Sequence, residues 1–505
     1  MNNIRRKKYI HVLLCLCTVI TMICIAQFCT NGRNMAIYHI GPKMAEVVLP
    51  AILRYTNNNI KGNESCPYKQ LYPRTKLNVY EGAITEWNGL NSKQKSATPR
   101  NIQPLWINPK IRLNPEKYLL VIPRGGPNNQ MYELREALFI AIKLNRTIVM
   151  PKFFKHFTDS QATGHRNTYI HPSHRLDVEN FCKFASCITI DQFAETCGFK
   201  VDAVIQMRNY SKEDLKIQEK YMRMPLPRDG EYLSQSVAIP NGKVQKYIVT
   251  DEINEIFETD ARCLVFPYPL FNLRIRASKT EKKGKNKKYK FSQSLVNLED
   301  SPDVLLMKEI IKLTRNPTYI ANMAKEYISK SIFKGRPFIS VHWRYEELDF
   351  MNRCRFDLKK GNLSKARKKF CEKTLGVSGS DIADIVLKKI LSIRNETNVR
   401  DIYIASPPSE REKIANTSRI LFESHKFNTL SSPDLEAFIT EHHGSCGNIM
   451  KHFNDILSTT EMEICSKGIV FLSSATSTWS LNVKHLRLTS DAKNLLCQYD
   501  EPMYS

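Results

Sequence analysis

Residues 118–151 read YLLVIPRGGPNNQMYELREALFIAIKLNRTIVMP, and this stretch decides the fold class. The apolar run 118–122 has the length and composition of a buried strand, and the loop 123–129 ends it. Apolar residues then recur at the spacing of one helix face: Met131, Leu134, Leu138, Ala141 and Ile142. A second apolar run, 147–150, stops at Pro151. Strand, helix and strand in this order predict a βαβ unit of a parallel sheet.

The same alternation returns in the second part of the chain. Further strands are predicted at 337–341, 402–405 and 469–472. Further helices are predicted at 303–331 with an interruption near Pro317, around 382–393, at 452–466 and from Thr478 onward. We therefore expect an α/β protein with two domains, residues 116–315 and 316–505.

Composition and charge exclude several classes of protein. The chain has 505 residues, of which 42% are hydrophobic and 25% charged, and this mix excludes wholesale disorder, collagen and a multi-span membrane protein. The net charge of +25 suits an anionic partner, which could be nucleic acid, a membrane surface or a phosphorylated small molecule. The run 279–290 holds seven lysines and is typical of a solvated loop, with substrate or membrane contact as the alternative.

The N-terminus predicts the compartment. Residues 10–29 contain no charged side chain, and a helix of these 20 residues matches a hydrocarbon core of about 30 Å. The basic residues 5–8 precede it, which predicts a single-pass type II signal-anchor. Residues 1–9 are then a cytosolic tail, and 30–115 a luminal stem and lead-in. A cleaved signal peptide is the alternative, although its apolar stretch is usually about 7–15 residues long.

Cysteines and glycosylation sequons agree with a luminal catalytic part in the Golgi or endoplasmic reticulum. Ten of the 14 cysteines follow the predicted anchor, and an even number fits disulfides, whose connectivity stays open. Six Asn-x-Ser/Thr sequons also follow it: Asn63, Asn145, Asn209, Asn362, Asn395 and Asn416. This location argues against nucleic acid as the partner. The C-terminus is not KDEL-like, so both compartments remain possible.

Three loops that follow predicted strands are candidate ligand sites, because parallel sheets bind ligands beyond the carboxyl ends of their strands. The first is 125–130, where Gly125 and Gly126 let the backbone come close to a ligand. The N–H groups at the following helix start can hold an anion, and Asn129 offers a donor and an acceptor. A tight turn capped by asparagine is the alternative.

The second loop follows the strand at 337–341. Strand periodicity places His342 and Arg344 on one face, with Trp343 on the other. The fork of Arg344 can hold a diphosphate with two hydrogen bonds. The alternatives are an ion pair of Arg344 with a carboxylate at 346–349, and a packing role for His342.

The third loop, 473–480, is rich in hydroxyl groups between a strand and a helix. Hydroxyls and helix N–H groups together can hold an anion. Simple N-capping by Ser477 is the alternative. Trp479 could stack on a base, although a core position is the simpler interpretation.

No metal ion is expected. The sequence contains no Asp-x-Asp, and the cationic Arg344 can neutralise a diphosphate in place of a metal. The histidine-containing segments 171–174 and 441–443 show no recognised ligand set. The cysteines at 182, 187 and 197 lack the paired spacing of a zinc site.

Taken together, these segments resemble the GDP-fucose protein O-fucosyltransferase family. The resemblance spans about 115–490 and depends on the order of its motifs. The motifs are 125–130 with 144–151, then 341–344, then 463–465 leading into 471–474 and 477–480.

The resemblance implies a GT-B fold, in which two Rossmann-like domains face each other across a cleft. The first domain would be on the acceptor side and the second on the GDP-fucose side. It also implies inverting, metal-independent transfer of fucose from GDP-fucose, with no other cofactor. By the same resemblance Arg344 grips the β-phosphate, and Arg344 and Asn129 are the catalytic candidates. The donor-binding candidates are Gly125, Gly126, Asn129, His342, Arg344, Ser477 and Thr478.

Three features depart from the family pattern. The stretch 124–127 has no carboxylate where some members have a catalytic base, Trp343 replaces a Leu, Val or Met, and 279–290 resembles an insertion. The function expected is fucosylation of a Ser or Thr hydroxyl of a secretory-pathway protein. The alternatives are a fucosyltransferase that acts on a glycan hydroxyl and a non-catalytic luminal binding protein of the same fold.

Overall fold

The computed structural model describes residues 66–68, 71–74, 103–106, 108–155, 169–205, 212–222, 224–226, 248–269, 273–276, 288–290, 301–343, 347–361, 368, 371–372, 375, 379–473 and 477–489. All of them belong to one unit, Ser65–Ser505. No helix among these residues is both long and apolar enough to cross a bilayer. The predicted anchor at 10–29 and Arg344 lie outside the described residues.

Five parallel strands form the sheet of the N-terminal region, residues 108–314. They are β3 (Asn114–Ile122), β4 (Arg146–Val149), β7 (Cys187–Ile188), β8 (Ala203–Val204) and β10 (Cys263–Pro267). Their spatial order is β7-β4-β3-β10-β8. The chain moves outward from β3 to one edge and then returns to the other, so the strand order reverses between β3 and β10.

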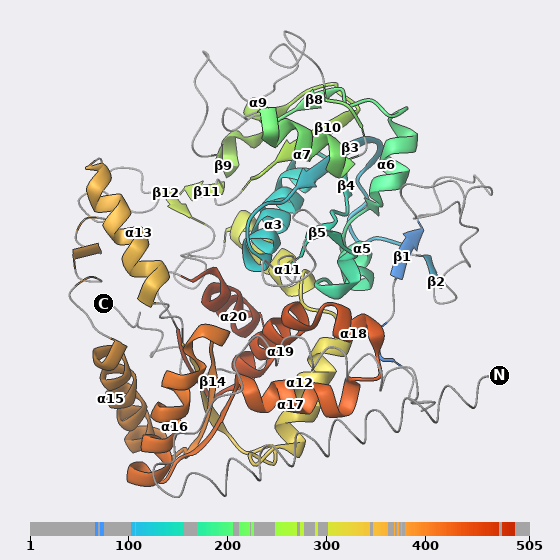
Figure 1. The fold of residues 1–505 in the computed structure, drawn as a ribbon. Coiled ribbons are helices and arrows are strands. Elements are labelled where there is room, and N and C mark those ends of the chain that lie inside the picture. Colours follow the sequence, from blue (N-terminus) through green and yellow to red (C-terminus); the bar gives the residue numbers. More distant parts are fainter. Residues whose placement is uncertain are drawn as a thin grey trace, which may run out of the picture. The chain divides into compact units, whose positions relative to one another are not determined.

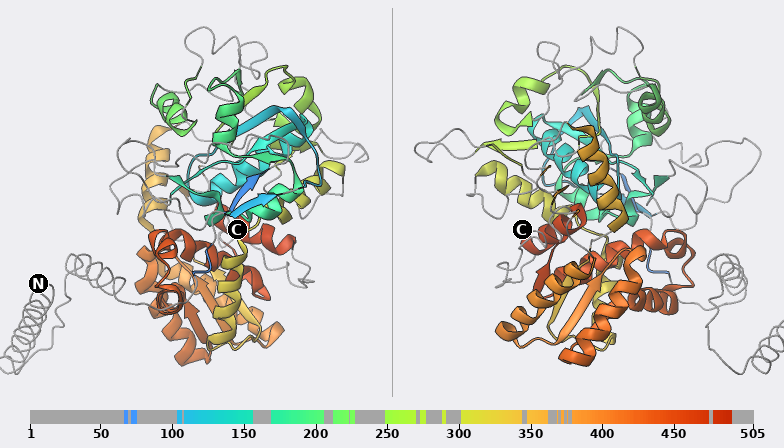
Figure 2. Two further views of the ribbon diagram at one scale, coloured as in Figure 1. Left: turned by 90° about the vertical axis from the view of Figure 1, so that its right-hand side faces the viewer. Right: turned by 60° about the vertical axis from the view of Figure 1, so that its left-hand side comes forward.

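Helices cover both faces of this sheet, as Figures 1 and 2 show. Leu119 and Val121 pack with α3 (Pro127–Lys143), α5 (Val178–Phe184), α9 (Ile253–Phe257) and α11 (Pro302–Leu313). Leu120 and Ile122 pack on the other face with α6 (Ile190–Thr196) and α7 (Lys212–Met222). Because β3 is buried on both faces, its apolar residues form a continuous run. The predicted strand–helix–strand order over 118–151 is confirmed.

Four parallel strands form the sheet of the C-terminal region, residues 318–489. They are β13 (Phe338–His342), β14 (Asp401–Ala405), β15 (Asn428–Ser431) and β16 (Val470–Leu472), in the order β15-β14-β13-β16. Three of these strands were predicted to within one residue. The sequence did not predict β15, an edge strand whose residues are half-buried and mostly polar.

Helices also lie on both faces of the second sheet (Figure 1). On one face Ile339 and Val341 pack with α15 (Gly379–Thr397) and α16 (Arg411–His425). The other face packs with α12 (Thr318–Lys330), α17 (Ser432–His443), α18 (Gly447–Lys451), α19 (Phe453–Lys467) and α20 (Thr478–Leu488). The predicted interruption near Pro317 is confirmed, since α11 belongs to the first core and α12 to the second.

Smaller elements complete the described chain. Three sheets are built from short strands: β1 (Leu71–Arg74) with β2 (Gln103–Trp106), β5 (Phe153–Phe154) with β6 (Tyr169–Ile170), and β9 (Ile248–Val249) with β11 (Leu273–Arg276) and β12 (Lys288–Lys290). The others are η1 (Pro172–His174), η3 (Thr250–Glu252), α13 (Glu347–Lys360) and η4 (Pro408–Glu410). The predicted loop at 279–290 is wrong for its last three residues, because they pair with β11.

Four disulfides join cysteines of the described residues: Cys66–Cys446, Cys182–Cys187, Cys197–Cys263 and Cys354–Cys371. This confirms the expected disulfides and excludes zinc binding by the cysteines at 182, 187 and 197. Cys465 is a buried free thiol.

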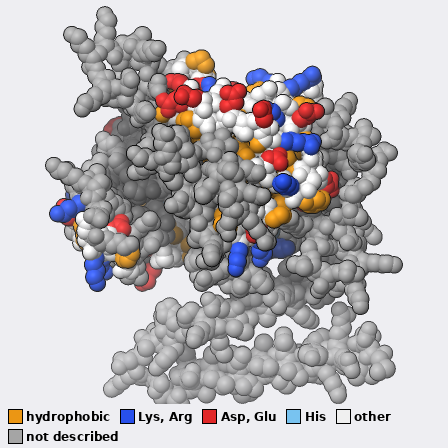
Figure 3. All heavy atoms as spheres, turned by 90° about the horizontal axis from the view of Figure 1, so that it is seen from above, with side chains coloured by type: hydrophobic (Ala, Val, Ile, Leu, Met, Phe, Trp, Pro, Cys, Tyr) orange, Lys and Arg blue, Asp and Glu red, His pale blue; other side chains and the backbone are white. Residues whose placement is uncertain are grey.

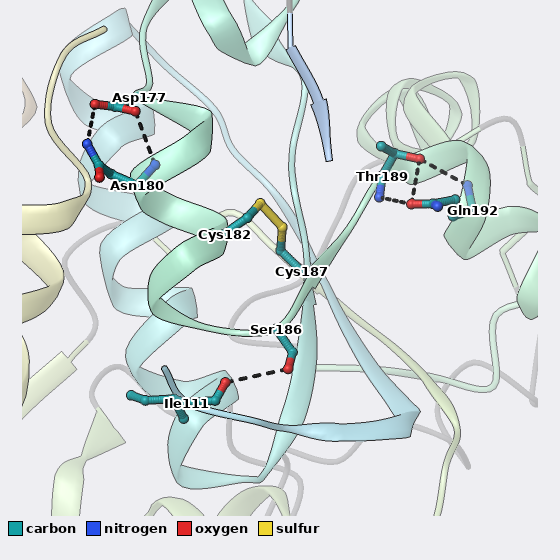
Figure 4. The surroundings of a disulfide bond; sticks show 8 residues. All are labelled: Ile111, Asp177, Asn180, Cys182, Ser186, Cys187, Thr189 and Gln192. Atoms are coloured by element: carbon teal, nitrogen blue, oxygen red, sulfur yellow. Dashed lines mark hydrogen bonds between the residues drawn. A yellow bond between two sulfur atoms is a disulfide. The ribbon is translucent and has the colours of Figure 1, made fainter. Parts of the chain in front are cut away.

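Local hydrogen bonds fix the elements around one of these bridges, as Figure 4 shows for Cys182–Cys187. The Asp177 carboxylate accepts a hydrogen bond from the backbone N–H of Asn180 at 3.1 Å, which caps α5. Thr189 and Gln192 form a capping box at the start of α6. The two helix starts are therefore determined by short-range sequence.

Surface charge is mixed on the face of the molecule seen in Figure 3. Among the described residues there, Asp and Glu side chains lie between Lys and Arg side chains. The net positive charge of the chain therefore does not gather into one basic patch on the described part of that face.

Candidate functional site

The strand order of both sheets places the three predicted loops at the points where ligands bind in parallel sheets. In the C-terminal sheet β13 and β16 are neighbours, and the strand order reverses between them. His342 ends β13, and Ser473 follows β16 at the same edge. In the N-terminal sheet the loop 125–130 follows β3, which borders the other reversal. Such reversals are the usual ligand sites of open α/β sheets.

The first loop is a tight backbone turn that leads into α3. Gly125 has a φ of +85°, a left-handed conformation, and a Cβ at this position would lie 3.0 Å from Asn129 Nδ2. Gly126 is the N-cap of α3 and Pro127 its first residue, and no side chain caps the helix. The interpretation of this loop as a turn capped by asparagine is therefore wrong. An uncapped helix start leaves backbone N–H groups for another acceptor.

At the end of β13, His342 is buried and held by α20. Its Nδ1 lies 2.7 Å from Ser480 Oγ, and its ring stacks on Trp479 with 4.1 Å between the centroids. Trp343 points to the opposite face and packs with α15 and α16, which confirms the predicted alternation. The predicted packing role of His342 is therefore present, and its predicted role in donor binding stays a prediction.

The third loop ends at the start of α20. Ser477 caps this helix and accepts a hydrogen bond from Trp479 N at 3.2 Å, so the capping interpretation is confirmed. Thr478 is the first residue of the helix, and both hydroxyl residues are half-buried. Trp479 belongs to the second core, and its Nε1 donates to Ser458 Oγ at 3.1 Å. The core interpretation of Trp479 is confirmed as well.

Two buried oxygen atoms in these loops have no hydrogen-bond partner among the described residues. They are Asn129 Oδ1 in the first loop and Ser473 Oγ at the end of β16. Buried polar atoms are nearly always hydrogen-bonded in folded proteins. Unpaired buried atoms of the described residues also occur away from these loops, for example on Gln218 and Ser418, so the two oxygens do not by themselves mark a site.

Helix α20 brings the three loops together. The first three residues of α20, Thr478 to Ser480, are the last three of the predicted third loop, and Ser480 contacts His342. Asn482, the next residue but one, donates from Nδ2 to Asn128 Oδ1 of the first loop at 2.9 Å. A single helix therefore contacts the end of β13 and both of the other loops. The sequence placed Ser480 in the hydroxyl-rich loop but predicted neither its contact with His342 nor any role for Asn482, because the partners are 138 and 354 residues away.

The contact between α3 and α20 carries a buried positive charge. Arg135 donates to Asn482 Oδ1 at 2.7 Å and to Thr314 Oγ1 at 2.9 Å. Burial lowers its pKa to about 10. Burial, reinforced by Arg135, also holds the pKa of His485 well below its usual value, and His485 Nδ1 lies 3.3 Å from Arg135 Nη1. These partners are neutral, but the buried carboxylate of Glu133 also borders the first loop and accepts a hydrogen bond from Arg124 N, so buried charges of both signs lie near it.

Two buried glutamate carboxylates lie on α19, and only Glu463 belongs to a segment, 463–465, that was singled out from the sequence. Burial raises the pKa of Glu461 to about 7, and its carboxylate accepts hydrogen bonds from Tyr403 and Ser432. Burial also raises the pKa of Glu463, which accepts a hydrogen bond from Asn316 at 2.8 Å. Both groups join α19 to neighbouring elements.

The histidines at 171–174 are structural groups, of which His174 is buried and His171 half-buried. His171 Nδ1 accepts a hydrogen bond from Ser173 N, and the His174 ring stacks on Tyr68 at 4.1 Å. Within the described ranges no group of three or more His, Cys, Asp or Glu side chains is arranged to hold a metal ion. The absence of a metal requirement stays a prediction.

Comparison with known proteins gives the class of this site. The fold is α/β with parallel sheets, and the sequence matches a family model described as GDP-fucose protein O-fucosyltransferase over residues 118–488. The class is thus a GDP-fucose-dependent glycosyltransferase. The chain belongs to the GDP-fucose protein O-fucosyltransferase family, which confirms the resemblance inferred from the motifs.

Solved structures of low identity show limited similarity. POFUT1 in complex with GDP is 17% identical with a TM-score of 0.45, and 75% of this chain and 97% of that chain are covered. The apo-form of POFUT1 is 18% identical with a TM-score of 0.46, and 74% of this chain and 95% of that chain are covered. Fucosyltransferase NodZ from Bradyrhizobium is 11% identical with a TM-score of 0.35, and 74% of this chain and 93% of that chain are covered. No curated protein sequence gave a match.

Proposed function

We propose that this chain transfers fucose from GDP-fucose to a Ser or Thr hydroxyl of a secretory-pathway protein, with inversion and without a metal ion. The observation that carries the proposal is the set of contacts made by α20. This helix contacts His342 and Asn128, and it begins at the hydroxyl-rich loop. Three loops that each match a family motif are thereby joined in one place.

The proposed architecture is GT-B, with Rossmann-like domains at 116–315 and 316–505 and a cleft between them. Its support is the presence of two separate parallel sheets, each with its own cores. The change from the first set of cores to the second falls between α11 and α12, at residues 314–317.

Each candidate residue has a proposed role toward the donor. Arg344 would hold the β-phosphate of GDP with its two-pronged guanidinium group, and Ser477 and Thr478 would contact the phosphates near the start of α20. Gly125, Gly126 and Asn129 would contact the donor from the first loop, and His342 would contact it from the end of β13.

Catalysis would come mainly from charge stabilisation. As the bond between fucose and the β-phosphate breaks, negative charge grows on that phosphate, and the preorganised donors around it stabilise the transition state. The acceptor hydroxyl would attack from the opposite side of the sugar carbon, which inverts its configuration. The group that takes the proton of the acceptor is left open.

Luminal location in the Golgi or endoplasmic reticulum completes the proposal. The four disulfides support an oxidising compartment. The type II anchor at 10–29 is proposed from the sequence alone.

The test uses residues 31–505 with GDP-fucose and excess EDTA. Folded cysteine-rich domains and free oligosaccharides serve as separate acceptors. Fucose on a Ser or Thr of the folded domains supports the proposal, and transfer only to oligosaccharides supports the glycan alternative. Activity that requires added Mn²⁺ or Mg²⁺ contradicts metal independence. Neither transfer nor GDP-fucose hydrolysis would indicate a non-catalytic binding protein.

A further inference from the structure

A buried chain of hydrogen bonds connects the C-terminal region to the first loop. It starts at Asp455 in α19, whose carboxylate binds the guanidinium of Arg175 with two hydrogen bonds, of 2.6 and 3.2 Å. The side chains of the two residues are only 3% and 2% exposed. Such a pair requires good geometry to offset the loss of hydration of both charges.

The remaining hydrogen bonds of Arg175 lead toward the loop. Its Nη2 donates to the backbone oxygen of Phe154 at 2.6 Å, and its Nη1 donates to Gln130 Oε1 at 3.3 Å. Gln130 is fully buried, and its Oε1 also accepts from Phe154 N at 2.8 Å. These two donors fix which end of the Gln130 amide is oxygen, so its Nε2 must face the other way.

That nitrogen holds the turn of the first loop. Gln130 Nε2 donates to the backbone oxygen of Gly125 at 2.8 Å. Gly125 is the residue with φ +85°, and a Cβ added there would lie 3.0 Å from Asn129 Nδ2. The position of this turn therefore depends on Gln130, which depends on Arg175 and, through it, on Asp455.

We infer that Gln130, Arg175 and Asp455 are positioning residues that set the first loop for donor binding and catalysis. The catalytic part of this inference rests on the proposed function. The structural part does not, since it concerns the turn of the unliganded protein. An apolar cluster could fill the same space, but it could not orient the Gln130 amide.

Arg146 provides a matched control. Like Arg175 it is a buried arginine. Its guanidinium donates to two backbone oxygens, those of Thr259 and Ala261. It begins β4, at the end of the sheet opposite the first loop. Replacing it by lysine therefore disturbs a buried arginine without disturbing the loop.

The experiment compares Arg175→Lys, Gln130→Met and Arg146→Lys with the unmodified protein, all as residues 31–505. Hydrogen exchange is measured at the amides of Arg124, which donates to Glu133, and Gln130, which donates to the Gly126 oxygen. We expect at least about tenfold faster exchange at both amides in the first two variants and little change in Arg146→Lys. The kcat with GDP-fucose should fall about 10–100-fold in the first two, because a displacement of about 1 Å can cost about a hundredfold, with a smaller change in KM.

Unchanged exchange at Arg124 and Gln130 in folded Arg175→Lys and Gln130→Met would overturn the inference. A double variant, Arg175→Met with Asp455→Leu, guards against misfolding because it leaves no unpaired charge. If this variant is folded, it should show the same fast exchange. If it fails to fold, the pair is a folding requirement and the inference is wrong. If the unmodified protein does not turn over GDP-fucose, the proposed function fails while the exchange data still decide the structural part.

Discussion

Helices α3 and α20 each begin directly after a candidate donor-binding loop, but their starts are built differently. The start of α3 has Gly126 and Pro127 and no side-chain cap. The start of α20 is capped by Ser477 and followed by Thr478. The first therefore offers backbone groups, and the second offers hydroxyl side chains as well.

The two starts are also supported differently. The start of α3 is supported by the Gln130 side chain, which donates a hydrogen bond to the Gly125 oxygen. The start of α20 is held by contacts with His342 and with the second core. This contrast indicates that the N-terminal loop depends on exact backbone geometry. The C-terminal loops depend on particular side chains. Of the five predictions below, four test this contrast, and the acid-unfolding prediction concerns both regions together.

The largest effect is expected in the C-terminal loops, for Arg344→Lys. Lysine keeps the charge but loses the two-pronged geometry, and removing one preorganised donor typically costs about 10²–10³ in rate, or about 2.7–4 kcal/mol. The measurement is kcat with GDP-fucose, together with a thermal melt. Arg355→Lys, on an exposed part of α13, is the control. A loss below about fivefold with an unchanged melt would show that Arg344 does not hold the phosphate. A large fall in melting temperature would support the structural ion pair.

Acidification should destabilise the protein through three histidines with lowered pKa values, which come from both regions. Burial lowers the pKa of His171 to about 3, of His174 to about 2 and of His452 to about 4. In the unfolded chain their pKa is about 6.5. The stability that these neutral histidines contribute is complete above pH 6.5. It is lost as the pH falls toward their pKa values in the folded protein, because only the unfolded state binds these protons.

Below pH 6.5 the free energy of unfolding should fall by about 1.4 kcal/mol per pH unit for each histidine. At pH 5 the loss of stability is then about 2 kcal/mol for each of them. Urea unfolding at pH 7, 6 and 5 measures it. The slope of the unfolding free energy with pH counts the protons taken up on unfolding. His174→Phe, which retains a ring beside Tyr68, should reduce that number by about one. An identical slope in this variant would show that His174 is not neutral in the folded protein.

Gly125→Ala tests whether backbone geometry matters at the first loop. An alanine there adopts a left-handed conformation at a cost of about 1–2 kcal/mol, and its Cβ would press against Asn129. Gly335→Ala has a similar cost, since Gly335 has a φ of +75°, but it precedes β13 at the end of the sheet away from the loops. Both should melt earlier, and only Gly125→Ala should lose about tenfold or more in kcat/KM. Equal activity in the two variants would contradict the proposed role of the turn.

The smallest effect is expected for Ser473→Ala. The Ser473 hydroxyl is buried without a partner among the described residues, and an unpaired buried group costs about 1–3 kcal/mol. Alanine should therefore raise the melting temperature of the unliganded protein. Ser340→Ala is the matched control and should lower it, because Ser340 Oγ donates to the Cys465 oxygen at 2.9 Å. A lower melting temperature for Ser473→Ala would mean that its hydroxyl is hydrogen-bonded in the folded state.

The sequence predicted the elements whose residues are buried on both faces or at helical spacing, such as β3, α3 and β13. It missed β7 and β8, which are two residues long, and the half-buried edge strand β15. Short or exposed strands carry too few apolar residues to produce a recognisable hydrophobic pattern. Such segments become strands because they pair with a neighbouring strand of the sheet.

The candidate site was predictable to a similar extent. Its loops could be found because each places glycine, arginine or hydroxyl residues directly after an apolar run. The side chains that organise them could not, because Asn482 meets Asn128 from 354 residues away and Arg175 meets Asp455 from 280. No local pattern encodes such pairs, since they follow only from the packing of the two regions.

A double-mutant cycle between Asn129→Ala and Thr478→Ala tests most directly whether the two helix starts bind one donor molecule. The quantity is kcat/KM for GDP-fucose in the unmodified protein, both single variants and the double variant. Side chains that act on the same ligand are coupled, so we expect an interaction energy of about 0.5–3 kcal/mol. Losses that add to within about 0.3 kcal/mol would contradict the account, because they would show that the N-terminal and C-terminal loops act independently.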